Sequence, residues 1–324
     1  MSKTYFVTGA QGCIGSWVVR LILEQGDRAV LFDLHHHDQR LAQVLNAEQL
    51  AAVQRIQGDV TDTDAVYTAI QSCGADAIVH LAGLQVPFCK ADPVLGARVN
   101  VVGTLNLFEA ARKLGIPRLV YASSAAVYDA AEGHDHVDES VAPAPATHYG
   151  VYKLANEGSA RIYWQDSQIA SVGLRPLTVY GLGRDQGLTS GPTRALKAAS
   201  LGRPFTIGFD GPTDFLYVAD AARAFVDCAT APLDGAHIFN LHGESLTVQD
   251  AVTIMNDLLP EELRGLIQID GPTLPIAPSL SDAALRAAVP NMPCTSLRDG
   301  LAATLKDFRR LQAAGQLPLD DIEN

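Results

Sequence analysis

Three glycines at intervals of three residues constrain the fold of this chain more than any other feature. They lie in the run from Gly9 to Gly15, directly after the apolar segment 5–7 and before apolar residues at helical spacing from 14 to 23. In a strand–turn–helix unit the first glycine allows a tight turn, the second lets the backbone approach a pyrophosphate, and the third lets the helix pack closely. The helix N-terminus adds free N–H groups and a partial positive charge. Glycines also mark ordinary turns, but this context favours a dinucleotide cradle made by Gly9, Gln11, Gly12, Cys13, Ile14 and Gly15.

An acidic residue ends the second predicted strand, which covers residues 29–32. Asp33 stands where a carboxylate typically binds the hydroxyls of the adenosine ribose. Such a carboxylate would repel a 2′-phosphate, and the first cation after it is Arg40. The position therefore predicts NAD rather than NADP as cofactor. The alternative is that Asp33 only caps a loop.

Short apolar strands alternate with helices through the first half of the chain. The pattern predicts strands at 5–7, 29–32, 53–56, 77–81 and 118–122, with helices at 14–23, 62–70 and 94–114. This order is typical of an α/β fold, a Rossmann-type doubly wound parallel sheet. After about residue 175, Gly and Pro become frequent and separate helices are expected at 218–229, 248–259 and 297–311. We therefore expect an NAD-binding domain at 1–174 and a smaller C-terminal α/β substrate lobe at 175–324, of which some segments could return to the sheet. The tail 317–324 is expected to be frayed.

The charge balance and the cysteines exclude several classes of partner. The 324 residues include 36 acidic and 24 basic side chains, which gives a net charge of −12 spread along the chain. This weighs against binding to nucleic acid or to an anionic membrane surface. No apolar run reaches about 18 residues, so no transmembrane helix is predicted. Five cysteines without a CxxC pair predict neither a disulfide framework nor a metal site. We expect a cytoplasmic enzyme with a small-molecule substrate.

A tyrosine and a lysine four residues apart suggest the chemistry. Tyr149 and Lys153 would lie on one face of a helix, one turn apart. A phenol has a pKa of about 10, and a nearby ammonium group together with the positive charge of the cofactor would lower it. Ser123 and Ser124 follow the strand at 118–122, at the sheet edge where ligands bind. The set predicts hydride transfer between a nicotinamide and a carbinol carbon, with Tyr149 carrying the proton. The alternative for the two serines is simple turn chemistry.

Together these segments resemble the extended short-chain dehydrogenase/reductases of the NAD-dependent epimerase/dehydratase family, and in particular its nucleotide-sugar epimerases. The matching segments run through most of the chain in the family's order: 8–15, 58–60, 80–83, 100–104, 123–128, 149–153, 174–176 and 214–220. The resemblance implies Ser124 as the catalytic serine, Tyr149 as acid/base and Lys153 as the ribose ligand that tunes it. It further implies cofactor contacts from Asp59, Val60, Leu81, Ala82, Gly83, Asn100 and Ser123. It also implies a homodimer built through the helices that contain Val94 and Tyr149.

Three departures from the family pattern bear on the substrate. Ala125 and Ala126 stand where the family's dehydratases carry an Asp-Glu pair, which disfavours elimination of water. Thr178 replaces an asparagine that is usual in sugar-nucleotide members. Thr213 replaces an arginine that clamps a diphosphate, and threonine cannot supply that bidentate contact. A nucleotide-sugar substrate is therefore open to question.

Other residues could hold an anionic group in place of the missing arginine. Arg184 and Arg194 lie in or next to the stretch 181–193, although a solvated loop arginine is an equal alternative. Gln85 follows the predicted cofactor segment. The predicted substrate contacts are thus Gln85, Ser124, Ala125, Thr178 and Arg184.

Three functions remain compatible with the sequence. The first is an NAD-dependent epimerase that oxidises and re-reduces a secondary alcohol of a sugar or sugar-like substrate, with or without a nucleotide. The second is an NAD-dependent dehydrogenase or ketoreductase of a small polar hydroxy substrate that exchanges its cofactor at each turnover. The third is a non-catalytic NAD-sensing protein on the same fold, against which the intact set of Ser124, Tyr149 and Lys153 argues.

Overall fold

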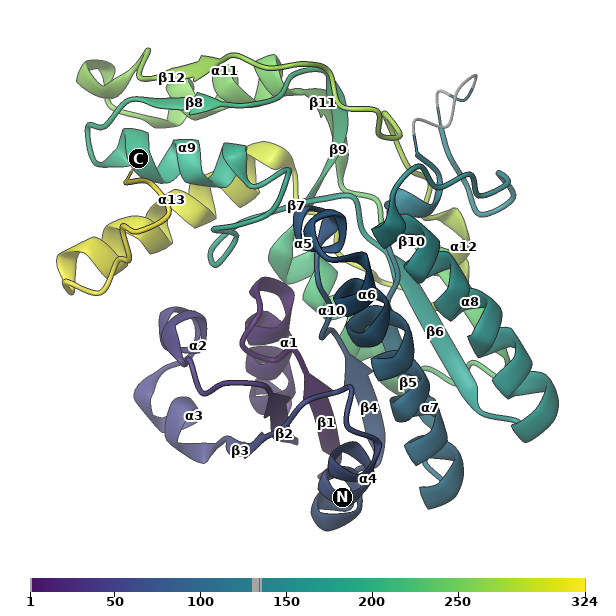
Figure 1. Ribbon diagram of the computed structural model, residues 1–324. Coiled ribbons are helices and arrows are strands. Elements are labelled where there is room, and N and C mark those ends of the chain that lie inside the picture. Colours follow the sequence, from purple (N-terminus) through teal and green to yellow (C-terminus); the bar gives the residue numbers. More distant parts are fainter. Residues whose placement is uncertain (1, 130–133, 135, 324) are drawn as a thin grey trace.

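A computed structural model describes residues 2–129, 134 and 136–323 (Figure 1). Its described part contains a seven-stranded sheet in which every neighbouring pair of strands is parallel. The predicted α/β fold with a doubly wound sheet is confirmed. The order across the sheet is β10 (Ala236–Asn240), β6 (Ala170–Arg175), β5 (Arg118–Ala122), β4 (Ala77–His80), β1 (Thr4–Thr8), β2 (Arg28–Asp33) and β3 (Gln54–Gln57).

Helices cover both faces of this sheet, which explains why its strands are apolar throughout. Tyr5 and Val7 belong to one hydrophobic core and Phe6, between them, belongs to the other, because successive side chains of a strand point to opposite faces. Helices α1 (Cys13–Glu24) and α10 (Val218–Thr230) pack on the first face. Helices α4 (Thr63–Cys73), α7 (Gly103–Leu114) and α8 (His148–Ser167) pack on the second.

The helix expected at 94–114 is interrupted in its first half. It consists of α6 (Pro93–Ala97), one turn of π-helix named η1 (Arg98–Val102), and α7. Such turns occur often at functional sites, and this one carries Asn100. Three short helices that the apolar pattern did not predict also flank the first domain: α2 (Gln39–Val44), α3 (Ala47–Ala52) and α5 (Val86–Ala91).

A smaller lobe lies across the carboxyl ends of the parallel strands, at the top of Figure 1. In it, β9 (Pro212–Tyr217) pairs with β7 (Thr178–Tyr180) in parallel and with β11 (Glu244–Thr247) antiparallel. A second small sheet pairs β8 (Phe205–Ile207) with β12 (Ile267–Ile269). The lobe's helices are α9 (Gly191–Ser200), α11 (Val248–Leu258), α12 (Ala283–Ala288) and α13 (Leu297–Ala313). Short helical turns η2 (Ala125–Val127) and η3 (Glu261–Leu263) complete the described elements.

The C-terminal tail is tied to the lobe, so the expectation that it frays is wrong for its described residues. The Lys197 ammonium pairs with Asp321 and donates to the carbonyl of Pro318 at 3.1 Å. Nε of Arg194 donates to the Asp321 carbonyl at 2.6 Å, and Ile322 is buried. Arg194 therefore binds the C-terminal tail, and it does not fit the alternative role of holding an anionic group of the substrate. Among the described residues, no helix has the length and apolar character needed to cross a membrane.

Candidate active site

The predicted cofactor and catalytic residues converge at one edge of the sheet. Each group follows a different parallel strand, and the carboxyl ends of parallel strands meet at the same edge. The glycine run follows β1, Asp33 ends β2, and the segment with Asp59 and Val60 follows β3. Leu81, Ala82 and Gly83 follow β4, and Ser123 and Ser124 follow β5. Tyr149 and Lys153 approach this edge from α8, and Asn100 from η1.

The glycine run forms a loop that no other residue type could build. Gly9 has φ +66°, and a β-carbon there would come 2.5 Å from the amide nitrogen of Ala82. A β-carbon on Gly15 would come 2.1 Å from the carbonyl oxygen of Gly9. Helix α1 starts at Cys13 without a side-chain cap, so its first N–H groups remain available for an anion. The loop fits the pyrophosphate of a dinucleotide.

Asp33 faces this loop and shapes the ribose site. Its Oδ2 accepts a hydrogen bond of 3.0 Å from the amide of Gln11. Burial raises the pKa of this carboxyl to about 6, and N–H groups of the loop oppose the rise. Arg40, the first cation after it, makes two hydrogen bonds to Asp185 of 2.8 and 2.7 Å. Because Arg40 is paired with Asp185, it is not free to bind the 2′-phosphate of NADP. The geometry therefore fits NAD better than NADP.

Affinity for NAD is expected to fall by about tenfold from pH 7 to pH 5. A carboxylate that is to accept hydrogen bonds from the ribose hydroxyls must be ionised, so a proton that binds Asp33 with a pKa of about 6 would compete with NAD below that pH. Above about pH 7 the carboxyl is ionised and the affinity should not change. Titration calorimetry on protein stripped of nucleotide measures the affinity for NAD at each pH. The affinity of Asp33→Asn should not depend on pH in this range. If it falls as in the wild type, the pH dependence belongs to another group.

Cys13 in the glycine loop is not a reactive thiol. Burial raises its pKa to about 11, despite the opposing charges of Arg184 and Arg40. The thiol stays protonated at neutral pH and is a weak nucleophile. Cys13 therefore serves as a small residue beside the phosphate site.

Tyr149 and Lys153 lie one above the other at the start of α8, whose cap, Thr147, accepts the amide of Gly150 at 3.1 Å. The Lys153 ammonium lies 5.4 Å from the centre of the Tyr149 ring and donates to the carbonyl of Ala122 at 2.8 Å. The side chain of Ser124 is hydrogen-bonded to that of Tyr149. The structure thus brings together the three predicted catalytic residues.

The pKa shifts at this cluster differ in part from the expectation. Burial raises the pKa of Tyr149, while its hydrogen bond with Ser124 and the charge of Arg184 lower it. Burial lowers the pKa of Lys153 to about 8. From the protein's own groups the net shift of the Tyr149 pKa is therefore upward, because desolvation of the phenolate outweighs the nearby charges. The expected lowering also relied on the positive charge of the cofactor, so it stays a prediction.

A buried ion pair supports the helix that carries Tyr149 and Lys153. Glu157 on α8 accepts hydrogen bonds of 2.7 and 2.5 Å from Arg175 at the end of β6. The hydroxyl of Ser123 donates to the same carboxylate at 2.5 Å. The Ser123 hydroxyl is thus occupied, which leaves only its backbone for the predicted contact with the cofactor. Glu157 was not predicted, because its partner Arg175 lies on the next strand, 18 positions away and beyond any helical spacing.

Asn100 leaves an unpaired polar atom beside the cofactor segment. Its side-chain nitrogen donates to the carbonyl of Leu84 at 3.1 Å, but its Oδ1 is buried without a partner. A β-carbon on Gly83 would come 2.6 Å from that oxygen. Buried polar atoms rarely stay unpaired, so this acceptor fits a donor from a ligand in the cleft.

His80 lies beneath the catalytic cluster and was not predicted as a site residue. Its ring nitrogens lie 2.6 Å from the hydroxyl of Thr8 and 3.0 Å from that of Thr104. Burial and the charge of Lys153 lower its pKa to about 3, so the ring is neutral. No local sequence pattern predicts these two hydrogen bonds, because Thr8 and Thr104 belong to other elements.

Two predicted substrate contacts do not fit the structure. Thr178 on β7 is fully buried, and its hydroxyl lies 2.7 Å from that of Thr213 on β9, which is also fully buried. One hydroxyl donates to the other, and both residues lack exposed surface, so neither is open to a ligand. Ala125 is also buried, and its amide donates to the carbonyl of Pro176 at 3.0 Å. The structure therefore buries the side chains of both Thr178 and Ala125 away from the surface that a substrate can reach.

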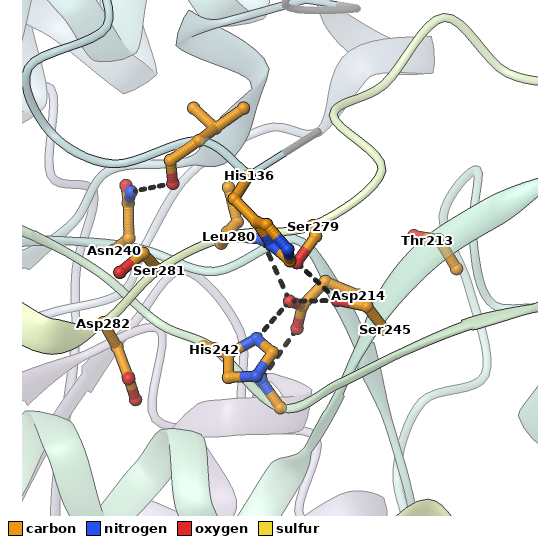
Figure 2. Close-up of polar contacts among 12 residues, drawn as sticks. His136, Thr213, Asp214, Asn240, His242, Ser245, Ser279, Leu280, Ser281 and Asp282 are labelled. Atoms are coloured by element: carbon orange, nitrogen blue, oxygen red, sulfur yellow. Dashed lines mark hydrogen bonds and ion pairs between the residues drawn. The ribbon is translucent and has the colours of Figure 1, made fainter. Parts of the chain in front are cut away.

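The strand that carries Thr213 is held by a buried carboxylate (Figure 2). Asp214 has no exposed surface and accepts hydrogen bonds from the amides of Gly243 and Leu280 at 2.7 and 3.1 Å. Its Oδ2 lies 2.5 Å from Nδ1 of His242 and 3.1 Å from the hydroxyl of Ser245. Asp214 thereby joins β9 to the loops that carry Gly243 and Leu280. Thr213 points away from this cluster.

His242 is expected to make stability depend on pH. Its hydrogen bond with Asp214 raises its pKa above the ordinary value of 6.5. A raised pKa in the folded state gives a contribution that is complete below pH 6.5 and is lost as the pH rises through the folded pKa. Unfolding in urea, compared at pH 6 and pH 9, should show a smaller loss of stability in His242→Gln than in the wild type. An equal loss in both proteins would contradict the prediction.

The glycine loop, the carboxylate of Asp33 and the cluster of serine, tyrosine and lysine together define an oxidoreductase site on a Rossmann-type fold. A model of the family described as "NAD dependent epimerase/dehydratase family" matches residues 5–241. The chain belongs to this family of extended short-chain dehydrogenase/reductases and is an NAD-dependent enzyme. In the described residues, no group of three or more His, Cys, Asp or Glu side chains could hold a metal ion.

Individual relatives cover most of the chain. The UDP-glucose 4-epimerase of Mycolicibacterium smegmatis is 32% identical over 241 residues, which span 72% of this chain and 75% of the relative. The structure resembles that of UDP-glucose 4-epimerase from Thermus thermophilus in complex with NAD. That resemblance has a TM-score of 0.80 at 26% identity and covers 94% of this chain and 99% of the other. It also resembles MoeE5 in complex with UDP-glucose and NAD, with a TM-score of 0.81 at 28% identity and coverage of 95% and 99%.

Proposed function

We propose that this enzyme is an epimerase-type oxidoreductase that acts at a secondary alcohol carbon of a sugar or sugar-like substrate. The observation that carries the proposal is the position of Tyr149, Ser124 and Lys153 beside the glycine cradle, at the edge of the sheet where a nicotinamide would enter. The named activities of the relatives support the same class of reaction.

Each residue of the cluster has a defined role in this proposal. Ser124 would hold the substrate oxygen. Tyr149, ionised once the positive charge of the cofactor offsets the cost of desolvation, would take the hydroxyl proton while the carbinol carbon loses a hydride and becomes a keto carbon. NAD, held by the glycine loop and Lys153, would supply a hydride acceptor that can also give the hydride back. For inversion, Tyr149 would return the proton to the substrate oxygen after the keto carbon has turned its other face to the cofactor. Lys153, held by the carbonyl of Ala122, binds the ribose and keeps a positive charge next to the phenol.

A segment of the smaller lobe supports retention of the cofactor, which an epimerase needs. The indole N–H of Trp17 on α1 donates to the carbonyl of Leu182 at 3.0 Å. Arg40 pairs with Asp185 and also donates to the carbonyl of Gln11 in the glycine loop at 3.1 Å. The segment 182–185 thus packs against the loop that cradles the pyrophosphate, and NAD would be slow to leave.

Chromatography of the nucleotide that denaturation releases from the purified protein tests this proposal. Near-stoichiometric NAD supports an epimerase that keeps its cofactor through turnover. Bound NADP would contradict the role of Asp33. Protein without nucleotide would favour an enzyme that exchanges NAD at each turnover.

The buried pair of Thr178 and Thr213 favours a second candidate. Neither residue can hold a diphosphate, because both hydroxyls are buried and bonded to each other. This supports an NAD-dependent dehydrogenase or ketoreductase of a small polar hydroxy substrate without a nucleotide. Reduction of added NAD in step with substrate consumption identifies this activity, whereas an epimerase yields no net reduced cofactor.

We also propose that the protein is a homodimer in the cytoplasm. Exposed apolar side chains gather on α6, η1 and α8, where Val94, Val102, Val151 and Ile162 are 65, 42, 48 and 44% exposed. A cavity of about 730 Å³ between α7 and α8 is lined in part by Leu105 and Ile162. These helices are the ones through which the family resemblance implies dimerisation. The five free cysteines support a compartment that keeps thiols reduced.

Ile162→Glu is expected to convert the dimer into monomers. The substitution places a charge in an interface that would otherwise exclude water, and an unpaired buried charge is strongly unfavourable. Sedimentation velocity at micromolar concentration measures the change. The control, Leu188→Glu, alters a similarly exposed apolar residue of the other lobe and should leave the mass unchanged. A wild-type protein that sediments as a monomer would overturn the proposed dimer.

A further inference from the structure

Arg184 is a cation that lines a pocket between α2 and the smaller lobe. It lies in the segment that joins β7 to α9, and its backbone amide donates to the carbonyl of Gly181 at 3.1 Å. One guanidinium nitrogen donates to the hydroxyl of Thr189 at 3.2 Å, but its Nε is buried without a hydrogen-bond partner. Among the described residues no carboxylate forms an ion pair with it. A buried N–H group of a guanidinium that lacks an acceptor is costly.

Gln85 supplies a second unsatisfied atom at the same place. It precedes α5 and follows the cofactor segment 81–83, and its Oε1 is buried without a donor. The side chains of Gln85 and Arg184 both lie next to Gly187. A β-carbon on Gly187 would come 2.4 Å from Oε1 of Gln85 and 3.1 Å from a guanidinium nitrogen of Arg184. A charged donor and a neutral acceptor therefore lie side by side.

The charge of Arg184 acts on two residues of the proposed active site. The charge of Arg184 lowers the pKa of Tyr149 and that of Cys13, so the guanidinium lies near both the acid/base and the glycine loop. Its neighbour Asp185 does not neutralise it, because both oxygens of that carboxylate bind Arg40. The position of Arg184 is fixed by these anchors on either side of it.

We propose that Arg184 and Gln85 bind a carboxylate and an adjacent hydroxyl, and that the substrate is a hydroxy acid of the sugar-acid class. A carboxylate would accept the unpaired N–H of Arg184, in the charge-assisted contact that guanidinium groups form best. A neighbouring hydroxyl would donate to Oε1 of Gln85. This inference rests on the proposed function, and it gives the anionic group a site that Thr178 and Thr213 cannot provide.

Two matched pairs of compounds test the inference. Glucuronate and glucose differ by one carboxylate, as do UDP-glucuronate and UDP-glucose, so the acid and the nucleotide are varied independently. Each compound is titrated by calorimetry into the NAD-loaded enzyme. The acid of at least one pair should bind about tenfold more tightly than its neutral partner, or better. The pair that shows this effect tells whether a nucleotide is part of the substrate.

Arg184→Met should remove the preference for the acid and leave the NAD content unchanged. Arg184→Lys, which keeps the charge without the planar donor pair, should restore it in part. Arg203→Met, at an exposed arginine of the same lobe, serves as the control and should keep the full preference.

Several results would overturn the inference. Equal binding of the acids and the neutral sugars, or no binding of either acid, would do so. Loss of NAD from Arg184→Met would assign the cation to the cofactor's phosphate instead. A pH profile of kcat that shifts in Arg184→Met, with unchanged acid binding, would make Arg184 a positioning residue for Tyr149. Because the readout is binding, it does not depend on hydride transfer, which Tyr149→Phe tests separately.

Discussion

Tyr149→Phe is expected to lower kcat by about 10²–10⁴-fold and to leave the NAD content of the protein nearly unchanged. The phenylalanine ring fills the same space but cannot carry the proton between the substrate oxygen and the site. Turnover is followed by reduced-cofactor absorbance or by formation of the inverted sugar, and NAD is measured by chromatography after denaturation.

A matched control is available three residues further along the same helix. The hydroxyl of Tyr152 donates to the carbonyl of Pro93 at 2.8 Å, outside the catalytic cluster. Tyr152→Phe should therefore keep most of the activity. Full activity in Tyr149→Phe would contradict its role as acid/base.

Arg175→Met is expected to lower the free energy of unfolding by about 3–5 kcal/mol, because it leaves the buried carboxylate of Glu157 without its partner. The side chains of Arg175 and Glu157 are only 5 and 6% exposed, so water cannot replace the lost contact. Denaturant unfolding monitored by circular dichroism measures the loss. Since most domains have a total stability of about 5–15 kcal/mol, the variant should be strongly destabilised.

A second substitution separates the charge effect from the loss of packing. Replacing both partners, as Glu157→Leu with Arg175→Met, removes the unpaired charge and should recover a large part of the stability. Arg298→Met, which breaks a solvent-exposed pair with Asp257, should change little. A double variant as unstable as Arg175→Met would show that shape, and not charge, dominates at this site.

The first half of the fold was predictable because its strands are buried on both faces and its turns carry glycine. The strand at 118–122 has the predicted bounds, and α1 extends the predicted helix by one residue at each end. Helices α2 and α3 escaped prediction because each has only 6 residues, too few to show a helical period. The π-helical turn at 98–102 has no signature in an apolar pattern that continues through it.

The site divides in the same way into local and long-range features. The glycine loop, Asp33 and the Tyr149–Lys153 spacing are local, so sequence spacing was enough to find them. The pairs Glu157–Arg175 and Thr178–Thr213 join residues from different elements, and no spacing rule connects them. The tail was misjudged for the same reason, because Arg194 and Lys197, which hold it, lie more than a hundred positions earlier.

The last strand of the sheet comes from far along the chain and determines how the molecule folds. β10 pairs with β6 across about sixty intervening positions, and α10 packs against α1, which lies near the start of the chain. Loops of this length must close before their contacts stabilise anything, so contact order is high and folding should be slow. A nascent chain without β10 would expose β6 as an unpaired apolar edge, open to pairing with another molecule. During synthesis, the enzyme therefore depends on its second half to protect a sheet that its first half has already begun to form.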